Sequence, residues 1–113
     1  MTVFGNGGQT RDFVYAGDIA QAAAKAVALT GYNVINISTG KETTLNTLLE
    51  AFKSACGHEL TVNYAPARSG DIFRSVLSNK KLEALLGFVP QMDIEHGIPK
   101  TYNDYLARRK EGL

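Results

Sequence analysis

The sequence contains one cysteine, almost no excess of charge of either sign, and no long apolar run. The single cysteine, Cys56, excludes an intramolecular disulfide and a zinc site built from cysteines. No run of ~18 apolar residues is present, so we expect no transmembrane helix, and the first residues lack the pattern of a signal peptide. Twelve basic and eleven acidic residues give a net charge of +1, which predicts no nucleic-acid or membrane partner. A reduced, cytoplasmic setting is expected.

Catalytic motifs are also missing. The segment Gly5-Asn6-Gly7-Gly8 lacks the third glycine of a G-x-G-x-x-G cofactor loop and leads into a strand-like stretch rather than a helix. No tyrosine is followed four positions later by lysine, and neither a P-loop nor a G-x-S-x-G motif occurs. His58 and His96 lack a partner in sequence, which favours structural or solvated roles. We therefore predict no catalytic residue, no metal ligand and no cofactor-binding residue in this chain.

The length of 113 residues suits one small domain, predicted to span residues 1–113. Hydrophobic residues make up 44% and charged residues 20%, as in an ordinary globular protein. A doubly wound nucleotide-binding domain plus a substrate lobe does not fit in this length. If the sequence belongs to a large enzyme family, we expect it to be a piece.

Periodicity and turn residues predict short strands alternating with about four helices. Val3 and Phe4 are expected to form a hairpin with residues 9–15, through the Asn-Gly turn between them. The remaining expected elements are a helix from an Asp18 cap to about Leu29, a strand over 33–37, a helix from Thr43 or Thr44 to Cys56, ended by Gly57, a strand over 60–64, a loop over 65–71, a short helix capped by Ser78, and a last helix capped by Asp93 and kinked or begun at Pro99.

Two arginines occupy positions suited to binding a ligand. Arg11 follows the glycine-rich turn and Arg68 lies in the loop over 65–71, and a guanidinium there can bind phosphate through two parallel hydrogen bonds. Phe13 would present a ring on the same face as Arg11, and Asp71 could accept hydrogen bonds from a sugar hydroxyl. A cation, a ring and a carboxylate are what a nucleoside diphosphate needs, although an arginine in a small domain is more often a surface charge.

Four separated blocks of the sequence resemble the C-terminal part of the NAD-dependent epimerase/dehydratase family, the extended short-chain dehydrogenase/reductases. The pattern is most similar to that of the UDP-sugar 4-epimerases of this family. The blocks are GNGGQTRDFVYAGDIAQA (5–22), NISTGKETTLNTL (36–48), APARSGDIFRS (65–75), and KKLEALLGFVP (80–90) followed by IEHGI (94–98). Ser38 stands where the family commonly has glycine.

The resemblance implies an α/β fold with α+β character. It is the substrate-binding lobe of such an enzyme without the N-terminal Rossmann half. It also implies that Arg11 and Arg68 contact the nucleotide diphosphate, that Phe13 lines the nucleotide pocket, and that Asp71 binds a ribose hydroxyl. Asp18 matches a recurrent aspartate of the family, for which a helix cap is expected. NAD would be bound by the complete enzyme and not by this chain alone.

Three hypotheses follow for function. The first is a UDP-sugar-binding lobe of a UDP-sugar 4-epimerase-like isomerase, inactive alone and partnered by the missing Rossmann half. The second keeps the family but makes the lobe part of a nucleotide-sugar 4,6-dehydratase or decarboxylase. The third is a non-catalytic remnant that self-associates through the apolar face left exposed by the missing half.

Overall fold

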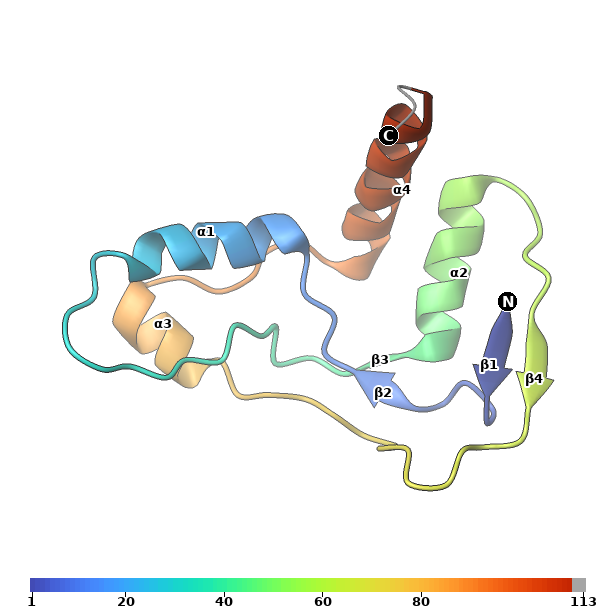
Figure 1. Ribbon diagram of the computed structural model, residues 1–113, viewed down its shortest axis with the longest axis horizontal. Helices are drawn as coiled ribbons and strands as arrows, with labels where there is room; N and C mark the ends of the chain where they lie inside the picture. Colours follow the sequence, from blue (N-terminus) through green and yellow to red (C-terminus); the bar gives the residue numbers. More distant parts are fainter. Residues whose placement is uncertain (111–113) are drawn as a thin grey trace.

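Two pairs of helices and two small pairs of strands make up the computed structural model, which describes residues 1–110 (Figure 1). The last three residues of the predicted domain lie outside the described residues. The elements are β1 (Thr2–Phe4), β2 (Thr10–Arg11), α1 (Ala16–Ala26), β3 (Thr43–Thr44), α2 (Leu45–Cys56), β4 (Asn63–Ala65), α3 (Lys80–Leu86) and α4 (Ile94–Lys110). The β1–β4 pair lies at the outer end, beyond α2 (Figure 1). Four helices with short strands match the predicted fold class.

The strands pair with distant segments rather than with their neighbours in sequence. β1 pairs in parallel with β4, with Val3 opposite Tyr64, and β2 pairs antiparallel with β3, with Thr10 opposite Thr44. The predicted hairpin between residues 3–4 and 9–15 is therefore wrong.

The glycine-rich turn is used by α2 instead of by a hairpin. The Asn46 amide donates to the carbonyl of Gly7 at 3.0 Å, and the Asn46 side chain donates to the carbonyl of Asn6 at 3.0 Å. Gly7 has a φ of 75°, and a Cβ atom there would lie 2.0 Å from the Asn46 side chain. The turn is thus shaped to receive the first turn of α2, which directs the two flanking strands to different partners.

Two predicted helix caps form and two do not. The Thr44 hydroxyl accepts from the amide of Thr47 at 3.0 Å, and Asp93 accepts from the amide of His96 at 2.9 Å, as predicted. α1 begins at Ala16, with no side-chain cap, so the cap predicted at Asp18 is wrong. α3 is preceded by Asn79 rather than by the predicted Ser78, although the Ser78 hydroxyl accepts from the amide of Lys80, the first residue of the helix, at 3.5 Å.

The Asp18 carboxylate has a different function from the one predicted. It is buried in the first turn of α1, where one of its oxygens accepts from the amides of Gln91 at 3.1 Å and Met92 at 2.9 Å. The segment preceding α4 is thereby fixed against the beginning of α1. An aspartate carboxylate can accept from amides of its own helix turn or from amides of a distant segment. The fold decides which of the two it binds.

Pro99 lies inside α4 without ending it, so the helix does not begin there. Proline removes one hydrogen bond and crowds the carbonyl four residues earlier, here that of Glu95, but the helix continues to Lys110. Gly57 and Gly87 close α2 and α3 in the left-handed region, with φ of 69° and 57°, and the ending predicted at Gly57 is confirmed.

Residues 33–37 do not form the predicted strand. Within residues 1–110 they pair with no other strand, and Ile35 and Ile37 line a hollow of about 290 Å³ together with Ala22 of α1 and Leu86 of α3. A strand needs backbone partners, and this part of the chain provides none.

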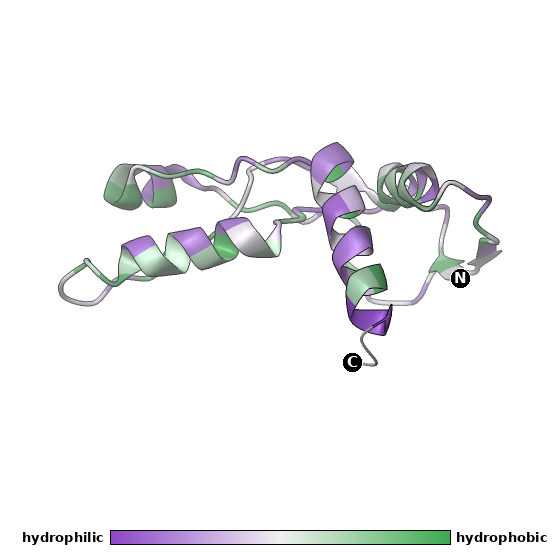
Figure 2. Ribbon diagram, turned by 90° about the horizontal axis from the view of Figure 1, so that it is seen from above, coloured by the Kyte–Doolittle hydropathy of each residue, from purple (hydrophilic) through white to green (hydrophobic). Residues whose placement is uncertain are grey.

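The molecule is flat and has little interior. α1 packs with α3 at one end and α2 with α4 towards the other (Figures 1 and 2). Only Val3, Ala22 and Leu82 are buried apolar residues within residues 1–110. The radius of gyration is 16.6 Å, whereas a compact chain of this length would have about 13 Å. Much apolar surface therefore lies open.

The contact between α2 and α4 involves the lone cysteine. The neighbouring Cys56 thiol of α2 raises the pKa of the Tyr102 hydroxyl on α4. Across residues 1–110, every helix is too short or too polar to traverse a bilayer.

Candidate functional site

Arg68 and Asp71 lie together in a pocket of about 280 Å³, called here the Arg68 pocket. Gly70, with a φ of 84°, allows the chain to turn between them, and the Asp71 amide donates to the Arg68 carbonyl at 3.3 Å. The turn therefore presents a cation and a carboxylate into one cavity. The lining residues are Phe4, Gly5, Asn6, Gln9, Ala67, Arg68, Asp71, Ile72 and Phe73.

Strand pairing assembles the walls of this pocket from two distant segments. Phe4 of β1 lies opposite Ala65 of β4, and the Gly5 amide donates to the Ala65 carbonyl at 2.8 Å. On the other side, the Thr10 amide donates to the carbonyl of Phe73 at 2.8 Å. Residues 4–10 and 65–73 are thus joined at both ends of the cavity.

The Arg68 guanidinium stacks on the ring of Phe4, with its central carbon 3.6 Å from the ring centroid. The side chain is exposed, and within residues 1–110 no hydrogen bond or ion pair engages the guanidinium. Stacking uses the face of the guanidinium and leaves the in-plane N–H donors at its edge. A positive group with unused donors, beside a carboxylate, suits a phosphorylated sugar or nucleoside.

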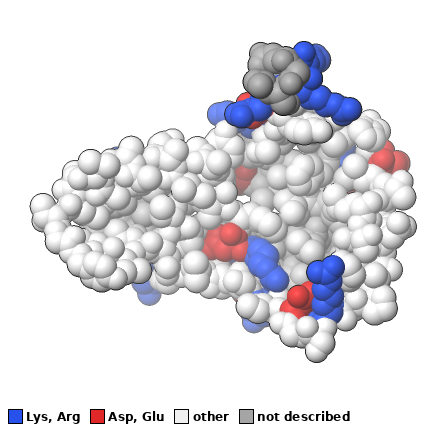
Figure 3. All heavy atoms as spheres, in the orientation of Figure 1, with Lys and Arg blue, Asp and Glu red and all other residues white. Residues whose placement is uncertain are grey.

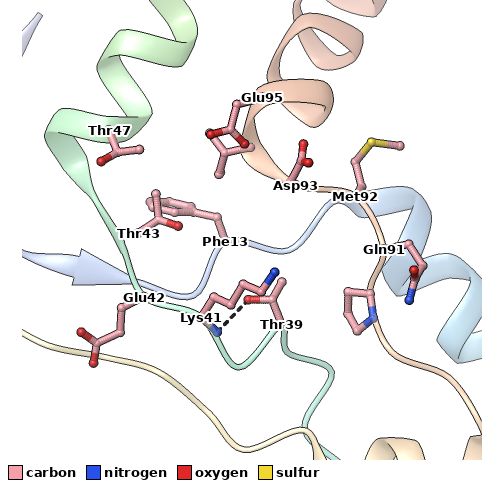
Figure 4. Close-up of a pocket in the computed structure, with 12 residues that line it drawn as sticks. Phe13, Thr39, Lys41, Glu42, Thr43, Thr47, Gln91, Met92, Asp93 and Glu95 are labelled. Atoms are coloured by element: carbon pink, nitrogen blue, oxygen red, sulfur yellow. Dashed lines mark hydrogen bonds between the residues drawn. The ribbon is translucent and has the colours of Figure 1, made fainter.

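Arg11 and Phe13 do not lie with Arg68 in this pocket. The Arg11 guanidinium is half-buried and donates from Nη1 to the carbonyl of Thr10 at 2.7 Å. Phe13 lines a second cavity, between β3 and the beginning of α4 (Figure 4). The structure brings together two of the four predicted site residues, Arg68 and Asp71.

The second cavity, of about 360 Å³, has a mixed lining of polar, acidic and apolar side chains. In Figure 4 the Phe13 ring lies among threonines, and the Lys41 amide donates to the Thr39 hydroxyl at 3.1 Å. Asp93 accepts a hydrogen bond from the His96 ring at 2.6 Å, and this bond, with that from the His96 amide, lowers the pKa of the Asp93 carboxyl. Three carboxylates, those of Glu42, Asp93 and Glu95, line the cavity against the single cation of Lys41, so it offers less for an anionic ligand than the Arg68 pocket does.

Asp12 is a residue whose role the sequence did not indicate. Its carboxylate accepts from the amide and hydroxyl of Thr39, at 2.9 and 2.6 Å, and from the amide of Gly40 at 3.0 Å. These bonds fix the segment carrying Arg11 and Phe13 to the turn at 38–40. The only signal in sequence was an acidic residue and a Ser-Thr-Gly turn, whose amides need acceptors.

Ser38, which differs from the family's usual glycine, is buried, and its hydroxyl donates to the carbonyl of Leu77 at 3.2 Å. In the part of the chain that the structure describes, the His58 ring has one hydrogen-bond partner, the carbonyl of Cys56 at 3.0 Å. Over residues 1–110, no three histidine, cysteine or acidic side chains gather closely enough to hold a metal ion.

Comparison with known proteins finds a matching family model and several relatives. A family model described as GDP-mannose 4,6 dehydratase matches residues 1–101. A UDP-glucose 4-epimerase of Mycolicibacterium smegmatis is 36% identical over 100 residues, covering 88% of this chain and 32% of the relative.

Two solved structures resemble the fold closely. The UDP-glucose 4-epimerase of Thermus thermophilus, in complex with NAD, is 37% identical with a TM-score of 0.82, over 91% of this chain and 34% of that one. The UDP-glucose 4-epimerase of Thermotoga maritima, with UDP-glucose, is 32% identical with a TM-score of 0.83, over 94% and 35%. The predicted fold class is confirmed, and the chain spans about a third of the length of the curated relatives it matches.

Proposed function

The chain belongs to the NAD-dependent epimerase/dehydratase family, and from this premise we propose that residues 1–113 act as the nucleotide-sugar-binding lobe of a UDP-sugar 4-epimerase-like enzyme. The observation that carries the proposal is the Arg68 pocket, where the Asp71 carboxylate and a guanidinium that has no ion pair among residues 1–110 face one cavity. Lining by Phe4 and Phe73 adds apolar surface around these two charges.

Each group in the pocket has a role that follows from its chemistry. The Arg68 edge donates to oxygens of the diphosphate, and the Asp71 carboxylate accepts from a ribose hydroxyl. A cavity of about 280 Å³ is near the lower end of ligand pockets, which usually run from about 300 to 1,000 Å³, and takes only part of a UDP-sugar. Weak binding by the isolated chain follows, because the remaining walls must come from elsewhere.

Arg11 and Phe13 keep the roles implied by the family as part of the proposal. Arg11 supplies a second contact to the diphosphate and Phe13 a wall of the nucleotide pocket. Since both lie outside the Arg68 pocket, they would serve a ligand that extends beyond it.

The glycine-rich turn of this chain lacks the form of a dinucleotide-binding loop, and NAD is held in the solved structure of the Thermus thermophilus relative. The glycine-rich turn leads into β2 rather than a helix, and its Gly7 carbonyl and the space beside it are used by Asn46. A dinucleotide loop instead needs free amides at a helix N-terminus. We propose that NAD is bound by polypeptide outside this chain, and that this lobe holds the nucleotide while chemistry occurs elsewhere. A cytoplasmic setting is part of the same proposal.

The uncovered end of the molecule is proposed to pack against that further polypeptide. Exposed apolar side chains gather on α1, on the segment after it, and near α3, and Figure 3 shows few charged side chains over this end. Relatives about three times longer supply the polypeptide that would cover it. For the chain alone we propose self-association through this end, which light scattering at increasing concentration would reveal as a rising mass. The apolar residues are Ile19, Val27, Tyr32, Val34, Val76, Leu77 and Leu85.

A second candidate function keeps the lobe and changes the nucleotide. The matching family model is described as GDP-mannose 4,6 dehydratase, which favours comparison with a guanine nucleotide. Parallel titrations with UDP, dTDP and GDP separate the two, because the diphosphate is shared and only the nucleoside differs.

The test of the proposed function is an NMR titration of the ¹⁵N-labelled chain with UDP, which detects weak binding. Arg68→Ala should lower the affinity for UDP by roughly tenfold, as expected for a lost hydrogen bond to a charged group. Arg74→Ala is the matched control. Arg74 lies on the same segment but is paired with Glu42 through bonds of 2.8 to 3.2 Å, so its loss should change affinity little. Equal losses for both variants would show a general charge effect and refute the proposed site.

A further inference from the structure

Phe4 holds the Arg68 guanidinium without neutralising it, and we propose that Phe4 is a positioning residue for the binding of the diphosphate. The inference rests on the proposed function of the Arg68 pocket. An arginine side chain is usually oriented by a carboxylate. Here the orienting group is an aromatic ring, which lies 64 positions away in sequence.

The three arginines near the site differ in what orients them. Arg74 is fixed by a bidentate ion pair with Glu42, and Arg11 donates to the carbonyl of Thr10. For Arg68, the only partner within residues 1–110 is the ring of Phe4, at 3.6 Å.

This difference has an electrostatic consequence. A phosphate is bound through the in-plane donors and the positive charge of a guanidinium. A carboxylate partner would occupy those donors and cancel that charge. An aromatic ring attracts the cation through its face and carries no net charge. Arg68 therefore keeps its charge and its edge donors while losing rotational freedom, which lowers the entropic cost of binding.

The ring itself is well supported. Phe4 is half-buried, its backbone is fixed by β1–β4 pairing, and its carbonyl accepts from the Gln9 side chain at 2.7 Å. Arg68, in contrast, is exposed on a turn. The ring is fixed by its strand and the guanidinium is exposed, as a positioning role of the ring requires.

The experiment compares UDP with uridine, which lacks the diphosphate, in NMR titrations of the 113-residue chain. Phe4→Leu should lower UDP affinity roughly two- to fivefold, the range expected for an exposed cation–π contact, and leave uridine affinity unchanged. Phe4→Tyr, which keeps a ring, should bind UDP like the parent chain. In an Arg68→Ala background, Phe4→Leu should have no further effect on UDP.

A fluorescence measurement keeps the proposal testable if Phe4→Leu does not fold. The chain has no tryptophan, so Phe4→Trp introduces a single reporter. Its emission should differ between the chain that retains Arg68 and the chain that also carries Arg68→Ala, and UDP should change it only when Arg68 is present. An identical spectrum in both backgrounds would overturn the stack.

Two further outcomes would overturn the proposal. Equal loss of UDP and uridine affinity in Phe4→Leu would show that the ring contacts the nucleoside directly. An undiminished effect of Phe4→Leu in the Arg68→Ala background would show that it acts independently of the guanidinium. Failure of the proposed function is distinct, because there Arg68→Ala alone would leave UDP affinity unchanged.

Discussion

Replacing Asp18 by alanine should destabilise the fold more than any other single loss of a carboxylate on its helices. The Asp18 side chain is 4% exposed, and one oxygen accepts from two backbone amides, at 2.9 and 3.1 Å. Hydrogen bonds to a charged group contribute about 1.5–3 kcal/mol each, and two bonds to one oxygen are worth less than twice that amount. The alanine variant would leave the amides of Gln91 and Met92 without this acceptor, so we expect a loss of about 3 kcal/mol.

The variant Asp18→Asn removes the negative charge but keeps an oxygen that can accept the two hydrogen bonds. It therefore separates the contribution of the charge from that of the hydrogen-bond geometry. Both bonds go to the same oxygen, and an asparagine carbonyl oxygen can occupy that position. Neutral hydrogen bonds are about half as strong as charge-assisted ones, so the loss should be about 1.5 kcal/mol. Asp104→Ala is the control, because it removes an exposed carboxylate paired with Arg108 at 2.8 Å and should cost at most about 0.5 kcal/mol.

Urea unfolding followed by circular dichroism would measure the three free energies. The expected order is Asp18→Ala, then Asp18→Asn, then Asp104→Ala. If Asp18→Ala were no more destabilising than Asp104→Ala, the anchoring of the segment before α4 by this carboxylate would be refuted. If Asp18→Asn matched the alanine variant, the amide would have failed to replace the carboxylate geometry.

Two glycine substitutions and one pH dependence provide further tests. Gly57→Ala should cost about 1 kcal/mol in urea unfolding, since its φ is 69° and its Cβ would meet nothing within 4 Å. Gly7→Ala should cost at least twice as much, because the added Cβ also displaces the Asn46 side chain; equal costs would show that conformation alone matters. The lowered pKa of Asp93 means that its contribution is present above pH 3.8 and is lost as pH falls through the folded value. The His96 amide shift should report that loss below pH 3.8, whereas a titration unchanged in Asp93→Asn would contradict it.

Features of the fold that depend on neighbouring residues could be predicted from the sequence. The Thr44 and Asp93 caps and the end of α2 at Gly57 involve groups within four residues of each other. Such signals need no knowledge of the rest of the chain, because the cap and the amide that it satisfies lie on the same turn.

Features that depend on distant residues could not be predicted. Asp18 looked like a cap because aspartate often is one, but its amides come from residues more than 70 positions away. The Asn-Gly turn was predicted to join a hairpin, but its carbonyls accept hydrogen bonds from Asn46 of α2 instead. The segment 33–37 has the composition of a strand, but pairing requires a partner strand that residues 1–110 do not provide.

The residues of the candidate site show the same difference between local and long-range features. Arg68 and Asp71 lie on one turn, so a local interpretation placed them together. Phe4 was overlooked because nothing near it in sequence indicates a cation, and Arg11 and Phe13 were grouped with Arg68 although the structure separates them.

The parallel pairing of β1 with β4 limits the order in which parts of the molecule can fold. Residues 2–4 meet residues 63–65 only after a loop of about sixty residues has closed, which is slow compared with forming a helix such as α2. The cavity between Phe4 and Arg68 cannot exist before that closure. During synthesis residues 2–4 must therefore wait until residue 68 has emerged from the ribosome, and the proposed ligand pocket is among the last features that the folding chain acquires.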